Sequence, residues 1–277
     1  TRIPIACSVR DFLQMLPGPP MTAVVTTSPI ESPYAWLRLG AALLLMTIGG
    51  AGMYAVMVVL PTLQQEFGIA RADASFPFTA TMLGFAVGGL MMGRVADRYG
   101  VFWPVVFSAF AQLLGFTLAS HAETAWQFAL CQGLLLGMLG CSATFAPLLA
   151  DVSHWFSRRR GIAVAICASG NYVGGAIWPP LTQYLVEQHG WRGAYQTIGI
   201  ICVVGLLPIA LLMRRPSPVD HPAPSSLAGG GAPPPPPLNI GPQALMVLLC
   251  IAGVACCVAM SMPQVHLVAL CGDLGFG

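Results

Sequence analysis

The stretch Gly93-Arg-Val-Ala-Asp-Arg-Tyr-Gly100 places two arginines and an aspartate between two apolar blocks, residues 76–92 and 101–120. A charged residue at the centre of a membrane-spanning helix costs about 2.5 to 3.5 kcal/mol on insertion scales, so charges gather in the connections between spans. Glycine at both ends of the stretch suits a tight return into the membrane. The stretch therefore predicts two membrane-crossing helices joined by a short charged turn.

The composition of the whole chain also points to a membrane protein. Charged residues make up 8% of the 277 residues and hydrophobic residues 56%, with a mean hydropathy of +0.74. An ordinary soluble domain carries roughly 25% charged residues, so a water-soluble globule is excluded. The same numbers exclude disorder for most of the chain. A net charge of +2 gives no dense basic patch, which argues against nucleic acid as a partner.

Seven apolar blocks are long enough to cross a bilayer, which takes about 20 residues in a helix. None of them carries a charged residue in its middle. We therefore predict an all-α membrane protein. The predicted spans are residues 37–60, 76–92, 101–120, 125–150, 161–186, 194–213 and 243–262.

The arginines set the expected orientation, because all 12 basic residues are arginines. With a cytoplasmic N-terminus, ten of them fall in the N-terminal arm and the inside connections, and two, Arg71 and Arg192, fall outside. Cytoplasmic connections carry the excess of basic residues in membrane proteins. We expect a multi-pass protein of the cell's inner (plasma) membrane with its N-terminus in the cytoplasm.

The chain divides into four predicted regions. Residues 1–35 form an N-terminal cytoplasmic arm, and residues 1–20 are a candidate spurious extension because they precede Met21. A six-helix bundle follows at 36–213, then a linker rich in proline and glycine at 214–241, which polyproline II structure would stiffen. Residues 242–277 hold the seventh span and the start of a second bundle, and they end in a glycine-rich turn, so we expect a fragment.

An internal repeat relates the second and fifth spans. Residues 84–89 and 170–175 both read G-x-x-V-G-G. Small residues four apart let helix backbones approach closely. The two spans run in opposite directions, as an inverted repeat of three plus three helices requires in a secondary transporter. Chance matching in a glycine-rich membrane sequence is the alternative.

The charged stretch resembles the signature G-x-x-x-D-R-x-G-R-[KR] of the major facilitator superfamily, which joins the second and third spans of those transporters. Val101 and Phe102 stand where the family has a basic pair. The resemblance implies a major facilitator fold, here the N-terminal six-helix bundle plus the first helix of the second bundle. The residues that match the signature are Gly93, Asp97, Arg98 and Gly100.

The same resemblance implies a gate at the cytoplasmic face. In the family, the aspartate at the position of Asp97 interacts with a helix end in the other half of the molecule. The arginine pairs with an acid at the inner end of the fourth span, where this chain has Asp151. Asp151 is therefore the expected partner of Arg98 or of Arg94. The alternative is a turn that only anchors the topology.

A second motif, HWFSRRRGIAVAICASG at 154–170, resembles the opening of the fifth span in the monocarboxylate-transporter and oxalate/formate-type branch. Three arginines lead into the span, and three glycines follow at the spacing of the first part of an antiporter motif. Gly175 replaces the proline of that motif, so antiport is not inferred. The residues of this motif are Arg158, Arg159, Arg160, Gly161, Gly170 and Gly174.

These resemblances imply secondary active transport of a small organic solute, a monocarboxylate-like anion, by alternating access. They leave open a coupling proton or a counter-solute, and they imply neither an enzyme nor a cofactor. Tyr54 and Asn171 are candidate contacts along the solute path, with interhelical hydrogen bonding as the alternative. The five histidines and nine cysteines show no zinc-type spacing.

Three other classes of protein compete with this interpretation. A seven-helix receptor or sensor fits the number of spans, but the cytoplasmic N-terminus argues against it. A membrane-embedded enzyme would need paired catalytic polar residues at one depth, and the sequence offers none. A non-functional truncated transporter is the third, and we expect no transport by these 277 residues alone.

Overall fold

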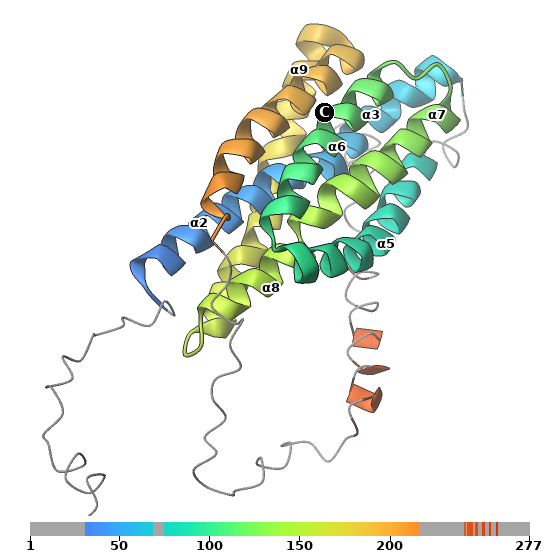
Figure 1. The fold of residues 1–277 in the computed structure, drawn as a ribbon. Coiled ribbons are helices and arrows are strands. Elements are labelled where there is room, and N and C mark those ends of the chain that lie inside the picture. The colour runs from blue at the N-terminus through green and yellow to red at the C-terminus, as the bar shows by residue number, and fades with distance from the viewer. Residues whose placement is uncertain are drawn as a thin grey trace, which may run out of the picture.

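The computed structural model describes residues 31–68 and 75–215 continuously, and the single positions or short runs 241, 243–245, 247, 248, 251, 252, 255 and 259. Throughout this part of the chain the regular structure is helical, with no strand, as the sequence predicts (Figure 1). Residues 1–30, the linker from residue 216 and most of the seventh span lie outside the described residues. Among the described residues, five helical stretches between Pro33 and Leu212 are long and apolar enough to cross a membrane.

The first span is longer than predicted and is broken in its middle. It consists of α2 (Pro33–Gly49) and α3 (Ala51–Phe67), which meet at Gly50. The Ser32 side chain accepts a hydrogen bond from the Ala35 N–H, and Pro33 occupies the first turn, so α2 has two ordinary start signals. Gly68, with φ of 61°, ends α3 in the left-handed conformation that favours glycine.

The second and third spans are α5 (Phe76–Tyr99) and α6 (Phe102–Ser120). The charged stretch is not the turn that we predicted, because α5 continues through Asp97 and Arg98 to Tyr99. Its 24 residues extend about 36 Å, which exceeds the roughly 30 Å hydrocarbon core. The charged end of α5 can therefore stay helical outside the membrane. Gly100, with φ of 80°, makes the turn itself.

The fourth span is irregular where the sequence predicts one helix over 125–150. It starts as α7 (Ala125–Leu130), widens into a π-helix η1 (Cys131–Gly140) and tightens into a 3₁₀ segment η2 (Cys141–Thr144). It then continues as α8 (Ala146–Trp155), with a proline in its first turn. In the predicted repeat, spans one to three form one triplet and spans four to six form the other. The first span of each triplet is thus interrupted near its middle.

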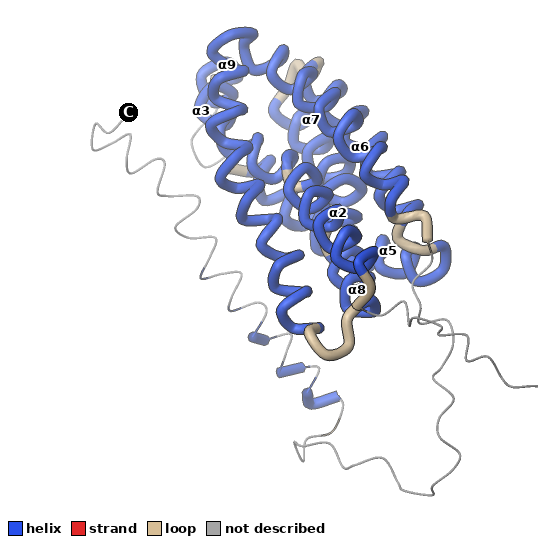
Figure 2. Tube along the Cα trace, turned by 90° about the vertical axis from the view of Figure 1, so that its left-hand side faces the viewer, coloured by secondary structure: helices blue, strands red, loops and turns tan. Residues whose placement is uncertain are grey.

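The fifth and sixth spans form one long element, α9 (Arg160–Leu212). A straight helix of its 53 residues would measure about 80 Å, far more than a bilayer. Gly190, with φ of 68° and ψ of 168°, breaks the helical backbone and reverses the chain between the two predicted spans. In Figure 2, α3 lies near the end of the bundle at which α9 reverses, and α8 lies at the other end.

Glycines of the second span bring its backbone against the fourth. A Cβ added at Gly84 would lie 2.0 Å from the carbonyl oxygen of Gly133, and one added at Gly88 would lie 2.1 Å from that of Met138. Real Cβ atoms do not approach so closely, so these positions exclude any other side chain. α5 packs on η1 because both glycines are present.

Glycines of the fifth span do the same against the first. A Cβ at Gly170 would lie 2.5 Å from the carbonyl oxygen of Leu43, and one at Gly174 would lie 2.9 Å from that of Thr47. The middle span of each triplet thus contacts the first span of the other triplet: the second span packs on the fourth, and the fifth span packs on the first. This exchange is the packing expected of an inverted repeat.

Candidate functional site

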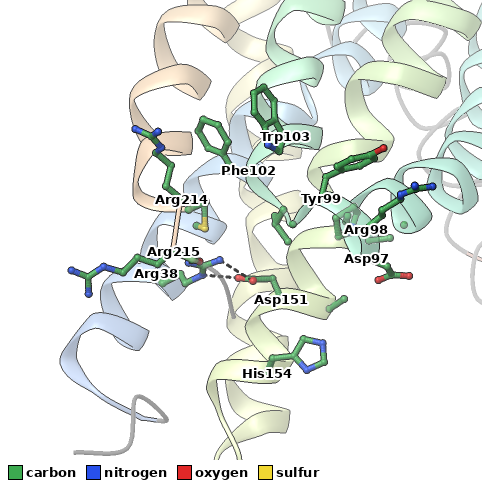
Figure 3. Close-up of a pocket in the computed structure, with 18 residues that line it drawn as sticks. Arg38, Asp97, Arg98, Tyr99, Phe102, Trp103, Asp151, His154, Arg214 and Arg215 are labelled. Atoms are coloured by element: carbon green, nitrogen blue, oxygen red, sulfur yellow. Dashed lines mark hydrogen bonds and ion pairs between the residues drawn. The ribbon is translucent and has the colours of Figure 1, made fainter. Parts of the chain in front are cut away.

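A cleft of about 810 Å³ opens at the end of the bundle where α2 begins and where α5, α8 and α9 end (Figure 3). The start of α6 and the segment Met213–Arg215 line it as well. The structure thus brings together the residues that the sequence assigned to a gate. Those that line the cleft are Gly93, Asp97, Arg98, Gly100 and Asp151.

Asp151 forms a buried ion pair, but its partner is Arg38. The Arg38 Nε lies 2.7 Å from one carboxylate oxygen, and its Nη2 lies 2.8 Å from the other, so the pair is bidentate. The two side chains are 2% and 3% exposed. The expectation that Arg98 or Arg94 pairs with Asp151 is wrong.

The two arginines of α5 have other surroundings. The Arg94 Nη1 donates to the carbonyl oxygen of Leu90, one turn earlier in its own helix. The Arg98 guanidinium lies 5.5 Å from the ring centroid of Tyr99. Both side chains are exposed. They extend from a helix whose end projects past the apolar core, so α5 does not point them at α8.

Arg38 also ties α2 to the end of α9. Its Nη1 donates to the carbonyl oxygen of Arg215 at 2.8 Å, and its guanidinium lies 4.8 Å from the Trp155 ring centroid. The Tyr34 hydroxyl donates to the carbonyl oxygen of Leu212 at 2.7 Å. The beginning of the first span, the end of the fourth and the end of the sixth are therefore held as one unit.

Asp97 differs from Asp151 in its exposure and in its lack of a partner in the part of the chain that the structure describes. Its side chain is exposed on the last turns of α5. Within residues 31–68 and 75–215, no hydrogen bond or ion pair engages its carboxylate. Figure 3 shows this carboxylate directed away from the Arg38–Asp151 pair. The cleft therefore combines a buried ion pair with an exposed carboxylate that has no partner among the described residues.

The second motif separates into a surface part and a packing part. Arg158, Arg159 and Arg160 are exposed between α8 and the body of α9. The backbone N–H groups of Arg158 and Arg159 donate to one Glu31 carboxylate oxygen at 2.9 and 3.1 Å, and the Arg160 side chain donates to Ser153. Gly161 has open space around it, whereas Gly170 and Gly174 make the close contact with α2.

Tyr54 and Asn171 lie together beside the break in the first span. The Tyr54 hydroxyl donates to the backbone carbonyl oxygen of Asn171 at 3.0 Å, which is the interhelical alternative. A Cβ added at Gly50 would lie 3.4 Å from the Asn171 side-chain oxygen. The structure therefore places the pair at the mid-bundle break, and a solute contact stays a prediction.

Two buried glutamines around this break form interhelical hydrogen bonds. The Gln132 Nε2 donates to the carbonyl oxygen of Gly52 at 2.7 Å, and the Gln112 Nε2 donates to that of Gly49 at 3.3 Å. A helix break inside a membrane frees backbone groups that need protein partners, and these amides supply them. The cluster GGAG at 49–52 was the sequence signal for such a break.

The described residues offer no group of three or more His, Cys, Asp or Glu side chains that could hold a metal ion. Ion pairs, aromatic rings and backbone carbonyls make up the cleft instead.

Comparisons with known proteins place this architecture in a family. Residues 42–277 match the family model of the Major Facilitator Superfamily. The Fujikurins efflux protein of Gibberella fujikuroi is 35% identical over 139 residues, which cover 50% of this chain and 29% of that protein. Human Monocarboxylate transporter 11 is 27% identical over 213 residues, which cover 74% of this chain and 44% of the transporter.

Two further similarities extend the range of these relatives. The Riboflavin transporter RibJ of Trypanosoma brucei brucei is 28% identical over 196 residues, which cover 70% of this chain and 36% of that protein. A crystal structure of the peptide transporter POT matches with a TM-score of 0.55 at 16% identity, over 86% of this chain and 49% of that one. The chain thus spans less than half the length of each of these proteins.

Proposed function

The chain belongs to the Major Facilitator Superfamily, and from this premise we propose that it forms the N-terminal bundle of a secondary transporter that moves a small organic solute by alternating access. The observation that carries the proposal is the cleft, which is lined both by Asp97, without a partner in the described part of the chain, and by a buried Arg38–Asp151 pair. We assign transport to the full-length carrier, because the relatives are longer than this chain. A cytoplasmic N-terminus and a location in the plasma membrane are part of the proposal.

The two carboxylates at the cleft suit two different tasks. Breaking a buried ion pair is strongly unfavourable, so Arg38 and Asp151 keep the bundle rigid as it rocks. A carboxylate near a helix N-terminus gains about 0.3 to 1 kcal/mol, which thermal motion can break. Asp97 is open to such a contact with a helix end of the second bundle. The cleft would therefore close and reopen around Asp97 while Asp151 stays paired.

A monocarboxylate-like anion is the solute class that we propose. Monocarboxylate transporters 11 and 2 are among the similar proteins, and the second motif points to the same branch. The buried polar side chains near the middle of the described spans are uncharged, as in Thr47, Gln112 and Gln132. This bundle would thus offer hydrogen bonds to the solute, and the positive charge for an anion would come from the second bundle.

Replacing Asp97 by asparagine tests the gate. We expect the Asp97→Asn carrier to insert normally and to transport about two- to fivefold more slowly, the factor that corresponds to the helix-end contact. The measurement is the initial rate of uptake of a labelled monocarboxylate in cells, normalised to carrier in the membrane. Arg94→Gln, one turn earlier on the same exposed face, is the matched control. Equal rates for wild type and Asp97→Asn would leave the charged stretch as a topological anchor only.

Replacing Asn171 by alanine tests the solute path. Loss of one hydrogen bond worth about 0.5 to 1.5 kcal/mol should raise KM roughly two- to twelvefold at unchanged expression. Tyr54→Phe is the companion variant, because it removes the hydroxyl of the other candidate solute contact together with the interhelical hydrogen bond, so it should raise KM and also lower thermal stability. KM and melting temperature are measured for both variants. An unaltered KM in Asn171→Ala would remove Asn171 from the proposed path.

A further inference from the structure

A second ion pair lies at the other end of the bundle, where α3 ends and α9 reverses. Arg192 follows Gly190 by two residues, and its Nη2 lies 2.9 Å from the Glu66 Oε1. The Trp191 indole N–H donates to the other oxygen of the same carboxylate. The side chains of Arg192 and Glu66 are 48% and 34% exposed, so this pair is wetter than Arg38–Asp151.

Arg192 also binds the end of the third span. Its Nε donates to the carbonyl oxygen of Ser120 at 3.1 Å, and its Nη2 donates to that of Ala122 at 3.2 Å. Its guanidinium lies 4.8 Å from the Trp191 ring centroid. One arginine thus joins the end of α3, the end of α6 and the turn of α9. We call Arg192, Glu66 and Trp191 the second clamp.

The second clamp has the same parts as the first clamp, which consists of Arg38, Asp151 and Trp155. Each has a guanidinium bound to a carboxylate near the end of an interrupted span, α3 in one and α8 in the other. In each, the guanidinium also donates to a carbonyl at the end of the last span of a triplet. The distance from guanidinium to tryptophan ring is 4.8 Å in both.

The turns at the two ends are related as well. Gly100 and Gly190 have φ of 80° and 68°, with ψ of 166° and 168°. Two residues later the chain has Phe102 in one turn and Arg192 in the other. Since the turn at Gly100 has Phe102 at the position of Arg192, the arginine of the first clamp comes from α2. Phe102 lines the cleft. The inverted repeat therefore produces an open cleft at one end and an arginine-filled contact at the other.

The burial of α3 decreases toward the end that carries the second clamp. Beyond Val56, only Val59 and Leu63 of this helix are buried. Its other end is the break at Gly50, where α2 takes over. The end of α3 therefore has fewer buried apolar residues than its start, and the polar contacts at Glu66 add to them in fixing the direction of the helix.

We propose that Glu66 and Arg192 are positioning residues that hold the second half of the first span, and with it Tyr54, against the fifth and sixth spans. Gly50 is the joint between this half and the half held by Arg38. Releasing the clamp lets α3 move while α2 stays in place. The clamp's effect on transport rests on the proposed function, because it would act through Tyr54, which binds the backbone of the candidate solute contact Asn171. The role in holding α3 does not.

A native thiol reports on the position of α3. A Cβ at Gly52 would lie 3.2 Å from the Cys141 Sγ, so α3 covers this cysteine directly, and Cys141 is buried. Cys131 is partly exposed and serves as the internal reference, and Cys167 and Cys202 are buried elsewhere against the first half of the span. Alkylation of each thiol by N-ethylmaleimide is measured by peptide mass spectrometry on the full-length carrier in membranes.

We expect Glu66→Gln and Arg192→Gln to raise the alkylation rate of Cys141, relative to Cys131, by about threefold or more, the response to losing a partly exposed ion pair with its hydrogen bonds. Cys167 and Cys202 should stay at their wild-type rates. Arg94→Gln, an exposed arginine outside the clamp, should change nothing. Arg192→Lys should be intermediate, because one ammonium cannot hold the carboxylate and both carbonyls together.

Unchanged Cys141 labelling in both glutamine variants would overturn the proposal. Equal increases at Cys141, Cys167 and Cys202 would overturn it too, because they would mean general unfolding rather than movement of α3. The thiol measurement uses no solute. A carrier that fails to transport but keeps clamp-dependent labelling would therefore refute the proposed function and leave the clamp intact.

Discussion

Replacing Asp151 by asparagine is expected to lower the free energy of unfolding by about 3 to 5 kcal/mol, because it leaves the Arg38 guanidinium buried without its counter-charge. That guanidinium makes two hydrogen bonds to the carboxylate, at 2.7 and 2.8 Å. Their loss separates the start of the first span from the end of the fourth. The measurement is unfolding of the detergent-solubilised full-length carrier by heat and by denaturant. Asp97→Asn is the control and should change stability by less than about 0.5 kcal/mol, as an exposed site does.

The double variant Arg38→Met with Asp151→Leu separates the pair from its parts. Removing both charges leaves no buried unpaired ion, so the double variant should be more stable than either single one. Equal losses for Asp151→Asn and the Asp97→Asn control would contradict the buried ion pair. A double variant with the sum of both single losses would contradict the direct coupling of the two side chains.

Replacing Gly88 by valine is expected to prevent the second and fourth spans from packing, with a loss of about 3 kcal/mol or more. Overpacking in a tight core costs typically 1 to 3 kcal/mol, and here the obstacle is a backbone oxygen that no rotamer change removes. The Cβ would lie 2.1 Å from the Met138 carbonyl oxygen. Gly89→Val is the matched control, since the neighbouring glycine has open space around it. Folded yield and melting temperature are the readouts.

The predicted inverted repeat implies that valine substitutions in the fifth span show the same contrast. Gly170→Val should match Gly88→Val, because its Cβ would lie 2.5 Å from the Leu43 carbonyl oxygen. Gly161→Val should be mild, because nothing lies within 4 Å of a Cβ there. A tolerated valine at Gly88 or Gly170 would argue that the backbones are not in close contact at that site. A mild effect of valine at one of these two glycines and a severe effect at the other would contradict the equivalence of the two triplets.

The helices and the family were predictable because they depend on local composition and short spacing. Apolar blocks of about 20 residues mark where hydrocarbon surrounds the chain, and the family model match and the all-helical structure confirm the predicted major facilitator fold. Hydropathy does not mark where a helix ends in water. The predicted span therefore stopped at residue 92, whereas α5 extends to Tyr99. The seventh span and the linker at 214–241 stay predictions.

The partners of the charged residues were not predictable from the sequence. Arg38 and Asp151 lie 113 positions apart, and Glu66 and Arg192 lie 126 apart, so only the packed bundle brings each pair together. Arg38 and Arg192 were counted as markers of orientation, a role that depends on depth alone. Both turned out to bind a carboxylate, a helix-end carbonyl and a tryptophan face. The interruption in η1 was hidden for a similar reason, since neighbouring helices stabilise it, whereas the glycines at 49–52 were a signal for the break at Gly50.

Counterflow is the direct test of whether these residues form half of a carrier driven by solute gradients. The full-length carrier is reconstituted into liposomes loaded with a high concentration of an unlabelled monocarboxylate, and a trace of the labelled solute is added outside without ATP. We expect a transient accumulation of label inside that exceeds the equilibrium level and is absent from protein-free liposomes. No accumulation with any member of a panel of small organic anions and neutral solutes would contradict it.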